Sequence, residues 1–281
     1  MSSKSIIVII GCGGMGLAIA RRLGSGSHLV LSDFSQAQLD SAAQTLRHEG
    51  HDVDTVQADI SNESAAQSLA QAAARLGVVR VIAHTAGLSP ARSPPDAIYK
   101  VDLLGVAHVI DAFLPVASSG TSLVIIASLA GHNTQGHLSA DLERHLATAP
   151  ASELLNHSEL EHVNSTSAES VPRFTAYGVS KRGNILRVQA FAAAWGQKGA
   201  RINTVSPGLI LTAMGHAELS GPMGEHMQDR IGKNPVARVG TASDVANAVA
   251  FLCSHEASFI TGTDILVDGG WGVSARWESK I

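Results

Sequence analysis

Short runs of branched apolar residues alternate with alanine-rich segments along most of this 281-residue chain. The first run, "SIIVII" (5–10), precedes "GLAIARRL" (16–23), and the next is "HLVLSDF" (28–34). Continuous apolar runs are typical of strands buried on both faces of a sheet, and no tight hairpin signal separates them. Strands joined by helices run parallel, with right-handed crossovers. The alternation therefore predicts an α/β fold, a doubly wound parallel sheet with helices on both faces.

About seven strands and six helices can be read in this way, which describes a Rossmann-type sandwich. No linker rich in Pro, Gly or Ser and no charge run divides the chain, so we predict a single domain over residues 1–281. One segment departs from the pattern. Residues 132–173 lose the strand texture and predict an insertion of short surface helices and a polar loop.

Composition narrows the class of protein. The chain is 45% hydrophobic, and its net charge of -4 gives no reason to expect nucleic acid as a partner. No signal-peptide pattern or membrane-spanning apolar run is present, and the two cysteines, Cys12 and Cys253, lie far apart. We therefore expect a cytoplasmic protein with no membrane partner. The thirteen histidines form no tight cluster, so no metal is expected.

A glycine-rich loop, "GCGGMG" (11–16), joins the first strand to its helix. Glycines there let the backbone approach a pyrophosphate, which free N–H groups and the helix N-terminus would bind. Asp33 follows 22 positions after Gly11, where a carboxylate binds ribose hydroxyls and repels a 2′-phosphate. Phe34 stands where an Arg would favour NADP. The loop predicts NAD; the alternative is that the glycines serve packing and Asp33 caps a helix.

Two further features, outside the glycine loop, predict parts of the site. Asp59 ends the third predicted strand, where it can reach the adenine amino group or cap the next helix. The stretch "TAYGVSK" (175–181) places Tyr177 and Lys181 four positions apart on a predicted helix, so both project from one face. A phenol with a pKa of about 10 becomes a useful proton donor and acceptor when a nearby ammonium lowers that pKa by roughly 2–3 units.

Together these motifs resemble the short-chain dehydrogenase/reductase family over nearly the whole chain. "TAG" (85–87), "IASLAG" (126–131), "NTVSPGLILT" (203–212) and "FITGTDILVDGG" (259–270) are similar to further family motifs. The resemblance implies that Ser128 polarises the substrate oxygen, Tyr177 transfers the proton, and Lys181 assists Tyr177 and binds the nicotinamide ribose. The residues implied in NAD binding are Gly11, Gly14, Met15, Gly16, Asp33, Asp59, Ile60, Ala86, Gly87, Tyr177, Lys181, Pro207, Gly208, Ile210 and Thr212.

The chain departs from the family pattern in three places. Its glycine loop is one residue shorter than usual, and Ile10 replaces the usual Thr. Asp102 occupies the place of an Asn that helps to hold a water in the proton relay, so its contribution stays open. Ser128 and Tyr177 are 49 positions apart because of the insertion. Arg182, next to Lys181, is interpreted as a solvated neighbour.

The insertion and the segment "LTAMGHAELSGPMGEHM" (211–227) suggest a substrate site with mobile walls. Met214, Met223 and Met227 are flexible apolar side chains that suit an adaptable lid. The hypothesis is that the substrate is a small-molecule ketone or secondary alcohol with apolar surface, such as a steroid-like molecule. The alternative is that the insertion serves contacts between subunits.

The predicted function is that of an NAD(H)-dependent alcohol dehydrogenase/ketone reductase. An NADP(H)-dependent carbonyl reductase is the alternative enzyme, but Arg21 and Arg22, the phosphate ligands it would need, lie well inside the predicted helix after the glycine loop. A regulator that senses a dinucleotide without chemistry is the alternative class, but it has no need of Ser128, Tyr177 and Lys181 together. The closing motif resembles a segment of the family's subunit interface, which predicts a homo-oligomer, a tetramer or a dimer.

Overall fold

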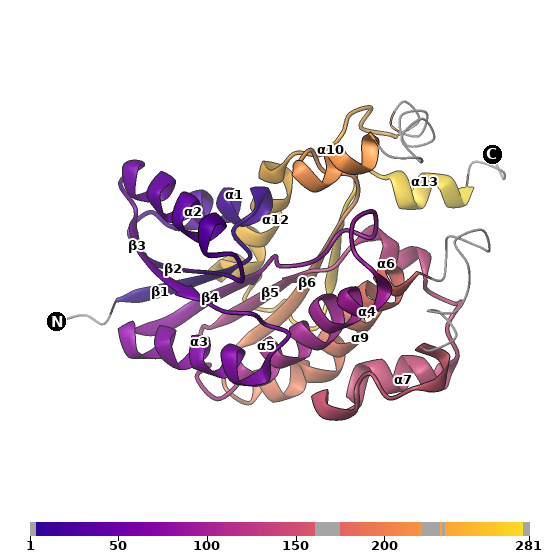
Figure 1. Ribbon diagram of the computed structural model, residues 1–281, viewed down its shortest axis with the longest axis horizontal. Coiled ribbons are helices and arrows are strands. Elements are labelled where there is room, and N and C mark those ends of the chain that lie inside the picture. Colours follow the sequence, from indigo (N-terminus) through magenta and orange to yellow (C-terminus); the bar gives the residue numbers. More distant parts are fainter. Residues whose placement is uncertain (1–3, 161–174, 221–230, 232–233, 278–281) are drawn as a thin grey trace.

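A computed structural model describes residues 4–160, 175–220, 231 and 234–277 of the chain. Seven parallel strands form one sheet in the order β3-β2-β1-β4-β5-β6-β7 (Figure 1). The predicted fold class is confirmed. The strands are β1 (Ser5–Ile10), β2 (His28–Asp33), β3 (Asp52–Gln57), β4 (Val78–His84), β5 (Ser122–Ile126), β6 (Arg201–Pro207) and β7 (Asp264–Val267).

Helices cover both faces of the sheet, and each face has its own apolar core. One face packs against α1 (Gly14–Leu23), α2 (Gln36–His48) and α12 (Ala242–Cys253). The other packs against α3 (Glu63–Leu76), α5 (Gly105–Phe113) and α9 (Ala176–Gly196) (Figure 1). Because the central strands are covered on both sides, their apolar runs are continuous, whereas the edge strand β3 alternates between exposed and buried residues. The strand order reverses between β1 and β4, which is where ligands bind in open α/β sheets.

The helix before β5 differs from the continuous helix that the sequence predicts over residues 96–116. It is built from α4 (Pro95–Ile98), a π-helical segment η1 (Tyr99–Leu104) and α5, and the N–H of Gly105 bonds to the carbonyl of Lys100 five residues earlier. Such wide turns occur mostly at functional sites. This one carries Asp102 on its buried side.

The described part of the insertion forms an extra layer on one side of the molecule. After α6 (Leu129–Asn133), helix α7 (Ala140–Thr148) packs on the side of α9 that faces away from the sheet (Figure 1). Leu142 and Leu146 of α7 are fully buried in a third apolar cluster with Leu103 and Val179. This part of the insertion supports α9. Residues 161–174, which lead back to Tyr177, lie outside the described residues.

The remaining short elements are η2 (Ala151–Glu153), α10 (Ala213–Leu219), η3 (His255–Ala257) and α13 (Trp271–Trp277). Met214 lies on α10 and is half-buried, whereas Met223 and Met227 fall outside the described ranges. None of the described helices combines the length and the apolar character needed to cross a bilayer.

Candidate active site

The glycine loop lies at the carboxyl end of β1, at the point where the strand order reverses. Gly11 has a φ of 95°, which side chains rarely allow, and a Cβ on it would lie 2.5 Å from the backbone nitrogen of Ala86. A Cβ on Gly16 would lie 1.9 Å from the carbonyl oxygen of Gly11. Thr85 fixes this contact because its hydroxyl donates to the Gly11 carbonyl at 2.7 Å. The loop therefore packs tightly against "TAG", although it is one residue short.

The outer side of this loop is open. No atom lies within 4 Å of the position a Cβ would take on Gly13, just before α1 begins. Such a Cβ-free cradle at a helix N-terminus suits a pyrophosphate, so the described residues fit a dinucleotide. Thr212 approaches the loop from the segment after β6: its Cγ2 lies 3.2 Å from where a Cβ on Gly14 would be. Ile210 is buried, and the N–H of Gly208 donates to the Val267 carbonyl at 3.0 Å, next to Pro207.

Asp33 links the glycine loop to the end of β2. Its carboxylate accepts the N–H of Cys12 at 2.8 Å on one oxygen and the N–H of Ser35 at 3.0 Å on the other. A carboxylate has about four lone-pair sites, so both oxygens can still accept ribose hydroxyls. The helix that follows is capped by Ser35 and not by Asp33. Phe34 is 70% exposed beside it.

Asp59 and Ile60 follow β3. Asp59 is exposed, and one of its oxygens accepts both the N–H and the hydroxyl of Ser61, at 2.9 and 2.7 Å. The helix after it is capped by Asn62, so the alternative that Asp59 caps this helix is wrong. Ile60 is buried, and its carbonyl bonds to the imidazole of His108.

Ser128 ends the loop after β5 and begins α6. Its hydroxyl oxygen accepts the N–H of Ala130 at 3.1 Å, as a helix N-cap does. This contact uses a lone pair and leaves the hydroxyl proton for another acceptor. Capping and substrate binding are therefore compatible at this residue.

Two glycines bring α6 against the first turns of α9. A Cβ on Gly131 would lie 2.8 Å from the backbone of Lys181, and one on Gly178 would lie 2.6 Å from the hydroxyl of Thr134. The helix that begins at Ser128 therefore touches the helix that carries Tyr177, despite the 49 positions between them in the sequence. Thr175 caps α9 by accepting the N–H of Gly178 at 3.0 Å.

Lys181 lies beside Tyr177, as the spacing predicts. Its ammonium nitrogen is 5.3 Å from the centroid of the Tyr177 ring, and the residue is 4% exposed. It donates to the carbonyl oxygen of Ile126 at 3.3 Å and lies 3.1 Å from a carboxylate oxygen of Asp102. A cation and a phenol on one helix face, with the cation held by a strand end, have the arrangement that proton transfer by the phenol requires.

Burial and neighbouring charges act in opposite directions on this lysine. Burial alone would lower the pKa of the Lys181 ammonium, but Asp102 and Tyr177 outweigh it, so the pKa lies above its ordinary value. Burial raises the pKa of the Asp102 carboxyl, while the ammonium and the Leu88 N–H oppose that rise. Lys181 is thus positively charged at neutral pH.

Similarity to known proteins identifies the family to which the chain belongs. Residues 4–140 match the family model described as short chain dehydrogenase, and residues 145–272 match the one described as Enoyl-(Acyl carrier protein) reductase. The protein named short-chain dehydrogenase/reductase bsc3 of Alternaria brassicicola is 39% identical over 268 residues, which cover 95% of this chain and 96% of that protein. The chain belongs to the short-chain dehydrogenase/reductase family. It is therefore an oxidoreductase of a family that binds NAD or NADP.

Other members of the family are similar along their whole length. The 3-alpha-hydroxysteroid dehydrogenase/carbonyl reductase of Comamonas testosteroni is 30% identical, over 95% of this chain and 96% of its own. Among solved structures, levodione reductase has a TM-score of 0.77 at 23% identity and covers 98% of this chain and 100% of that one. That structural likeness concerns the fold.

Within the family pattern, the structure corrects one interpretation and adds contacts that the sequence did not predict. Arg182 is not a solvated neighbour: its side chain is 11% exposed and pairs with Glu143 of α7 at 2.8 Å. His84, at the end of β4, is fully buried, and neither of its ring nitrogens has a hydrogen-bond partner among the described residues. The direct pairing of Asp102 with Lys181 was signalled only by an Asp where the family has Asn.

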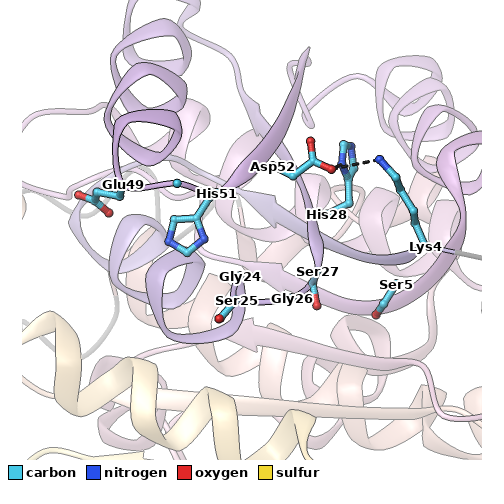
Figure 2. Close-up of a pocket in the computed structure, with 11 residues that line it drawn as sticks. Lys4, Ser5, Gly24, Ser25, Gly26, Ser27, His28, Glu49, His51 and Asp52 are labelled. Carbon is cyan, nitrogen blue, oxygen red and sulfur yellow. Dashed lines mark hydrogen bonds and ion pairs between the residues drawn. The ribbon is translucent and has the colours of Figure 1, made fainter.

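A separate cavity lies at the other end of the sheet. It has a volume of about 450 Å³ and opens between the amino ends of β1, β2 and β3, where Lys4, His28 and Asp52 line it (Figure 2). The strands of a parallel sheet all point away from this end, so the cavity is remote from the glycine loop and from Tyr177. It is polar, and no group of three or more His, Cys, Asp or Glu residues in the described ranges could hold a metal ion.

Proposed function

We propose that this enzyme interconverts a secondary alcohol and a ketone with NAD(H), using Tyr177 as the acid and base. The observation that carries the proposal is the position of Lys181: its buried ammonium lies 5.3 Å from the Tyr177 ring centroid, on a helix that packs against the one Ser128 begins. A phenol next to a fixed positive charge ionises more readily than a free phenol, which is what proton transfer near neutral pH requires.

Each of the three side chains has a distinct role in this proposal. The Ser128 hydroxyl donates a hydrogen bond to the substrate oxygen, for which its proton is free. Tyr177 gives a proton to that oxygen during reduction and takes one during oxidation. Lys181 stabilises the phenolate, and it is held by Asp102 and by the Ile126 carbonyl. When bound, the nicotinamide supplies or accepts the hydride.

NAD is the proposed cofactor because a carboxylate occupies the end of β2. Gly11, Gly14, Met15 and Gly16 would hold the pyrophosphate, and Asp33 the adenosine ribose. The available cations near α1 are already engaged: Arg21 pairs with Glu49 at 2.8 Å, and Arg22 donates to Asn247 at 3.3 Å. These contacts weaken the case for NADP, whose 2′-phosphate needs a free cation.

The rest of the dinucleotide site would come from four segments. Asp59 and Ile60 would border the adenine, Ala86 and Gly87 would line the floor, and the segment after β6 would close over the nicotinamide. The residues of that last segment are Pro207, Gly208, Ile210 and Thr212. Thr212 already lies against Gly14, which supports a single continuous site.

For the substrate we propose a bulky, apolar alcohol or ketone, such as a steroid-like molecule. One support is that a 30% identical relative is named a hydroxysteroid dehydrogenase/carbonyl reductase. A second is Met214 on α10, half-buried in the segment that follows the nicotinamide-binding residues. A panel of cyclic and linear ketones of increasing size tests this: equal kcat/KM for small linear and large cyclic ketones would contradict it.

The mechanism is tested with Tyr177→Phe, which keeps the ring and removes the hydroxyl. We expect kcat to fall about 100- to 10,000-fold while NADH binding, measured by fluorescence, stays near the original value. Ser128→Ala is the companion variant, for which a smaller loss is expected. Full activity in Tyr177→Phe would exclude this mechanism, and NADH binding without turnover of any alcohol or ketone would favour a dinucleotide sensor.

The cofactor is tested with Asp33→Asn, which keeps the shape and an oxygen acceptor but removes the charge. The original enzyme should use NAD with a higher kcat/KM than NADP, and Asp33→Asn should narrow that difference because the repulsion of the 2′-phosphate is lost. A preference for NADP in the original enzyme would instead support the carbonyl reductase alternative.

We also propose a cytoplasmic homo-oligomer, a tetramer or dimer. The edge strand β7 is half-buried along all four residues, and Phe259, just before it, is 102% exposed. An exposed apolar edge of this kind suits contact with a second copy. Light scattering on the purified enzyme measures the assembly, and a monomer at all concentrations would contradict the proposal.

A further inference from the structure

A buried carboxylate contacts the lysine that assists Tyr177. Asp102 lies on the π-helical segment η1 and is 0% exposed. One of its oxygens is 3.1 Å from the Lys181 ammonium, and the other accepts the N–H of Leu88 at 2.7 Å. The ammonium and the N–H both stabilise the ionised form of a carboxylate. The lysine therefore has a negative charge on one side and a phenol on the other.

Gly87 leaves this pair close-packed. A Cβ on Gly87 would lie 3.0 Å from the Asp102 carboxylate and 3.3 Å from the Lys181 nitrogen. Any larger residue at position 87 would press on both charged groups, so Gly87 favours their approach, in addition to its place in the "TAG" segment. Three separate segments of the chain therefore form the contact between Asp102 and Lys181: the loop after β4, η1 and α9.

The ionisable groups placed around Lys181 in the described part of the chain come from three elements. They are Asp102 from η1, Tyr177 from α9 itself and His84 from β4. Burial, followed by the charge of Lys181, lowers the pKa of His84 to about 3, so His84 is neutral in the working range. From β5 the contact is the Ile126 carbonyl, and from α7 the nearby charge, Glu143, pairs with Arg182. Asp102 is therefore the negative charge that acts on Lys181.

We propose that Asp102 is a positioning residue that holds the Lys181 ammonium, partly offsets its charge, and thereby sets the pH range of the reaction. The inference rests on the proposed function for its kinetic consequence, but its electrostatic part concerns the free protein. Seen from the Tyr177 oxygen, a positive and a negative charge 3.1 Å apart cancel in part. Tyr177 then keeps its proton to a higher pH than it would beside an unopposed lysine.

This arrangement favours ketone reduction over alcohol oxidation near neutral pH. Reduction needs Tyr177 as the protonated donor, and oxidation needs it as the phenolate acceptor. A carboxylate beside Lys181 raises the pH up to which Tyr177 stays protonated as the donor. The phenolate acceptor therefore forms only at a higher pH. An asparagine at position 102 would have the opposite effect, because it hydrogen-bonds without carrying charge.

The chain offers a direct measurement of this effect, because it has only two tyrosines, Tyr99 and Tyr177. Tyr99 is buried, which raises its pKa, and its hydroxyl has no hydrogen-bond partner among the described residues. Tyr99→Phe therefore removes an unsatisfied group and leaves Tyr177 as the single phenol. Its ionisation can then be followed by tyrosinate absorbance in the cofactor-free protein.

In the Tyr99→Phe background, Asp102→Asn should lower the ionisation midpoint of Tyr177 by about 1 pH unit. Asp111→Asn is the matched control: it lies on the adjoining helix α5, removes the same charge, and pairs with Arg187 at 4.0 Å instead of with Lys181. The control should leave the midpoint in place. An unchanged or higher midpoint in Asp102→Asn would overturn the proposal, because the carboxylate would then only pack or only keep Lys181 charged.

Two further measurements keep the test decisive. If Asp102→Asn does not fold, Asp102→Ser, which leaves room for water beside Lys181, takes its place with the same expected shift. Asp102→Glu keeps the charge and should keep the midpoint within a few tenths of the original; a shift as large as that of Asn would count against a charge effect.

The same variants are also tested by the pH dependence of kcat/KM. In Asp102→Asn, the acid limb of kcat/KM for alcohol oxidation should move to lower pH by the same amount as the absorbance midpoint. If Tyr177→Phe proves fully active, the proposed function fails while the absorbance result still decides the role of Asp102. If the midpoint moves but the kinetic limb does not, the effect on the pH range of the reaction is excluded.

Discussion

The two ends of the sheet each hold a lysine 3.1 Å from an aspartate, and the surroundings of the two pairs are opposite. At the carboxyl ends, the side chains of Lys181 and Asp102 are 5% and 0% exposed. At the amino ends, those of Lys4 and Asp52 are 62% and 59% exposed, at the mouth of the cavity in Figure 2. The distance is the same, so a difference in their effects must come from their surroundings, above all from their access to water.

Water screens the exposed pair and solvates each partner when the other is removed, so such pairs contribute between zero and about 1 kcal/mol. The buried pair has no such replacement. Its assembly required the removal of both charges from water, and the loss of one partner leaves the other uncompensated. Contact geometry alone therefore does not rank the two interactions.

The largest effect is expected from Lys181→Met, which leaves Asp102 buried without its cation. The free energy of unfolding should fall by about 3–5 kcal/mol at neutral pH, measured by urea denaturation. The loss should shrink as the pH falls, since Asp102 can take up a proton once its cation is gone. A loss that is independent of pH would show that packing, and not charge, stabilises this end.

The control for that prediction removes both charges. In Lys181→Met/Asp102→Leu no uncompensated charge remains, so stability should return most of the way to the original value, although activity stays low. A double variant as unstable as the single one would contradict the interpretation.

A somewhat smaller effect is expected from acid, through His84. Its folded pKa is about 3 and its unfolded value about 6.5, so the unfolded chain binds the proton first. The stability that depends on this neutral histidine is present above about pH 6.5 and is lost as the pH falls towards 3. Between pH 7 and about pH 4.5 the loss is about 3 kcal/mol. His84→Leu should flatten this dependence in urea titrations at the two pH values, whereas His48→Leu, at an exposed site, should retain the original slope.

A third ion pair is intermediate in exposure between the pairs at the two ends of the sheet. Arg182 and Glu143 are 11% and 29% exposed and join α9 to α7. Arg182→Ala should lower the free energy of unfolding by about 1 kcal/mol, more than an exposed pair and less than a buried one. Arg144→Ala, which removes an exposed pair of the same helix α7 with Asp141, should have almost no effect. Equal losses of unfolding free energy in Arg182→Ala and Arg144→Ala would contradict the proposed dependence on burial.

The smallest effect is expected at the amino ends. Lys4→Ala should cost less than about 1 kcal/mol, and high salt should abolish that cost because water and ions reach both partners. The same salt should leave the effect of Lys181→Met almost unchanged. Thermal unfolding at low and high salt compares the two, and a salt-sensitive Lys181→Met effect would show that water reaches the buried pair.

The sequence predicts well what is encoded locally. The central strands β1, β2, β4 and β5 are readable apolar runs, and the seven-stranded parallel fold is confirmed. The spacing of Tyr177 and Lys181 on one helix predicts their approach, because helical geometry fixes it. The family was also recognised from the motifs alone.

What the sequence does not predict depends on docking between distant segments. Arg182 was interpreted as solvated because its partner, Glu143, belongs to a helix whose place beside α9 is a tertiary feature. The π-helical segment that carries Asp102 is predicted as ordinary helix, because a single wide turn leaves no signal in the local residue pattern. That the insertion walls the substrate site stays a prediction; the support that its described part gives to α9 is a tertiary feature that the sequence does not predict.

The contact between α6 and α9 also has a consequence for how the family can acquire new chain length. Gly131 and Gly178 bring the two helices into direct contact, so the length of the chain between them does not by itself set their positions. For a flexible connection, each doubling of length costs only about 0.6 kcal/mol in closure entropy. The turn between α6 and α7 is therefore a place where an engineer could graft a foreign helix or a small binding module, provided that α7 keeps its packing on α9, and leave the geometry of Ser128 and Tyr177 undisturbed.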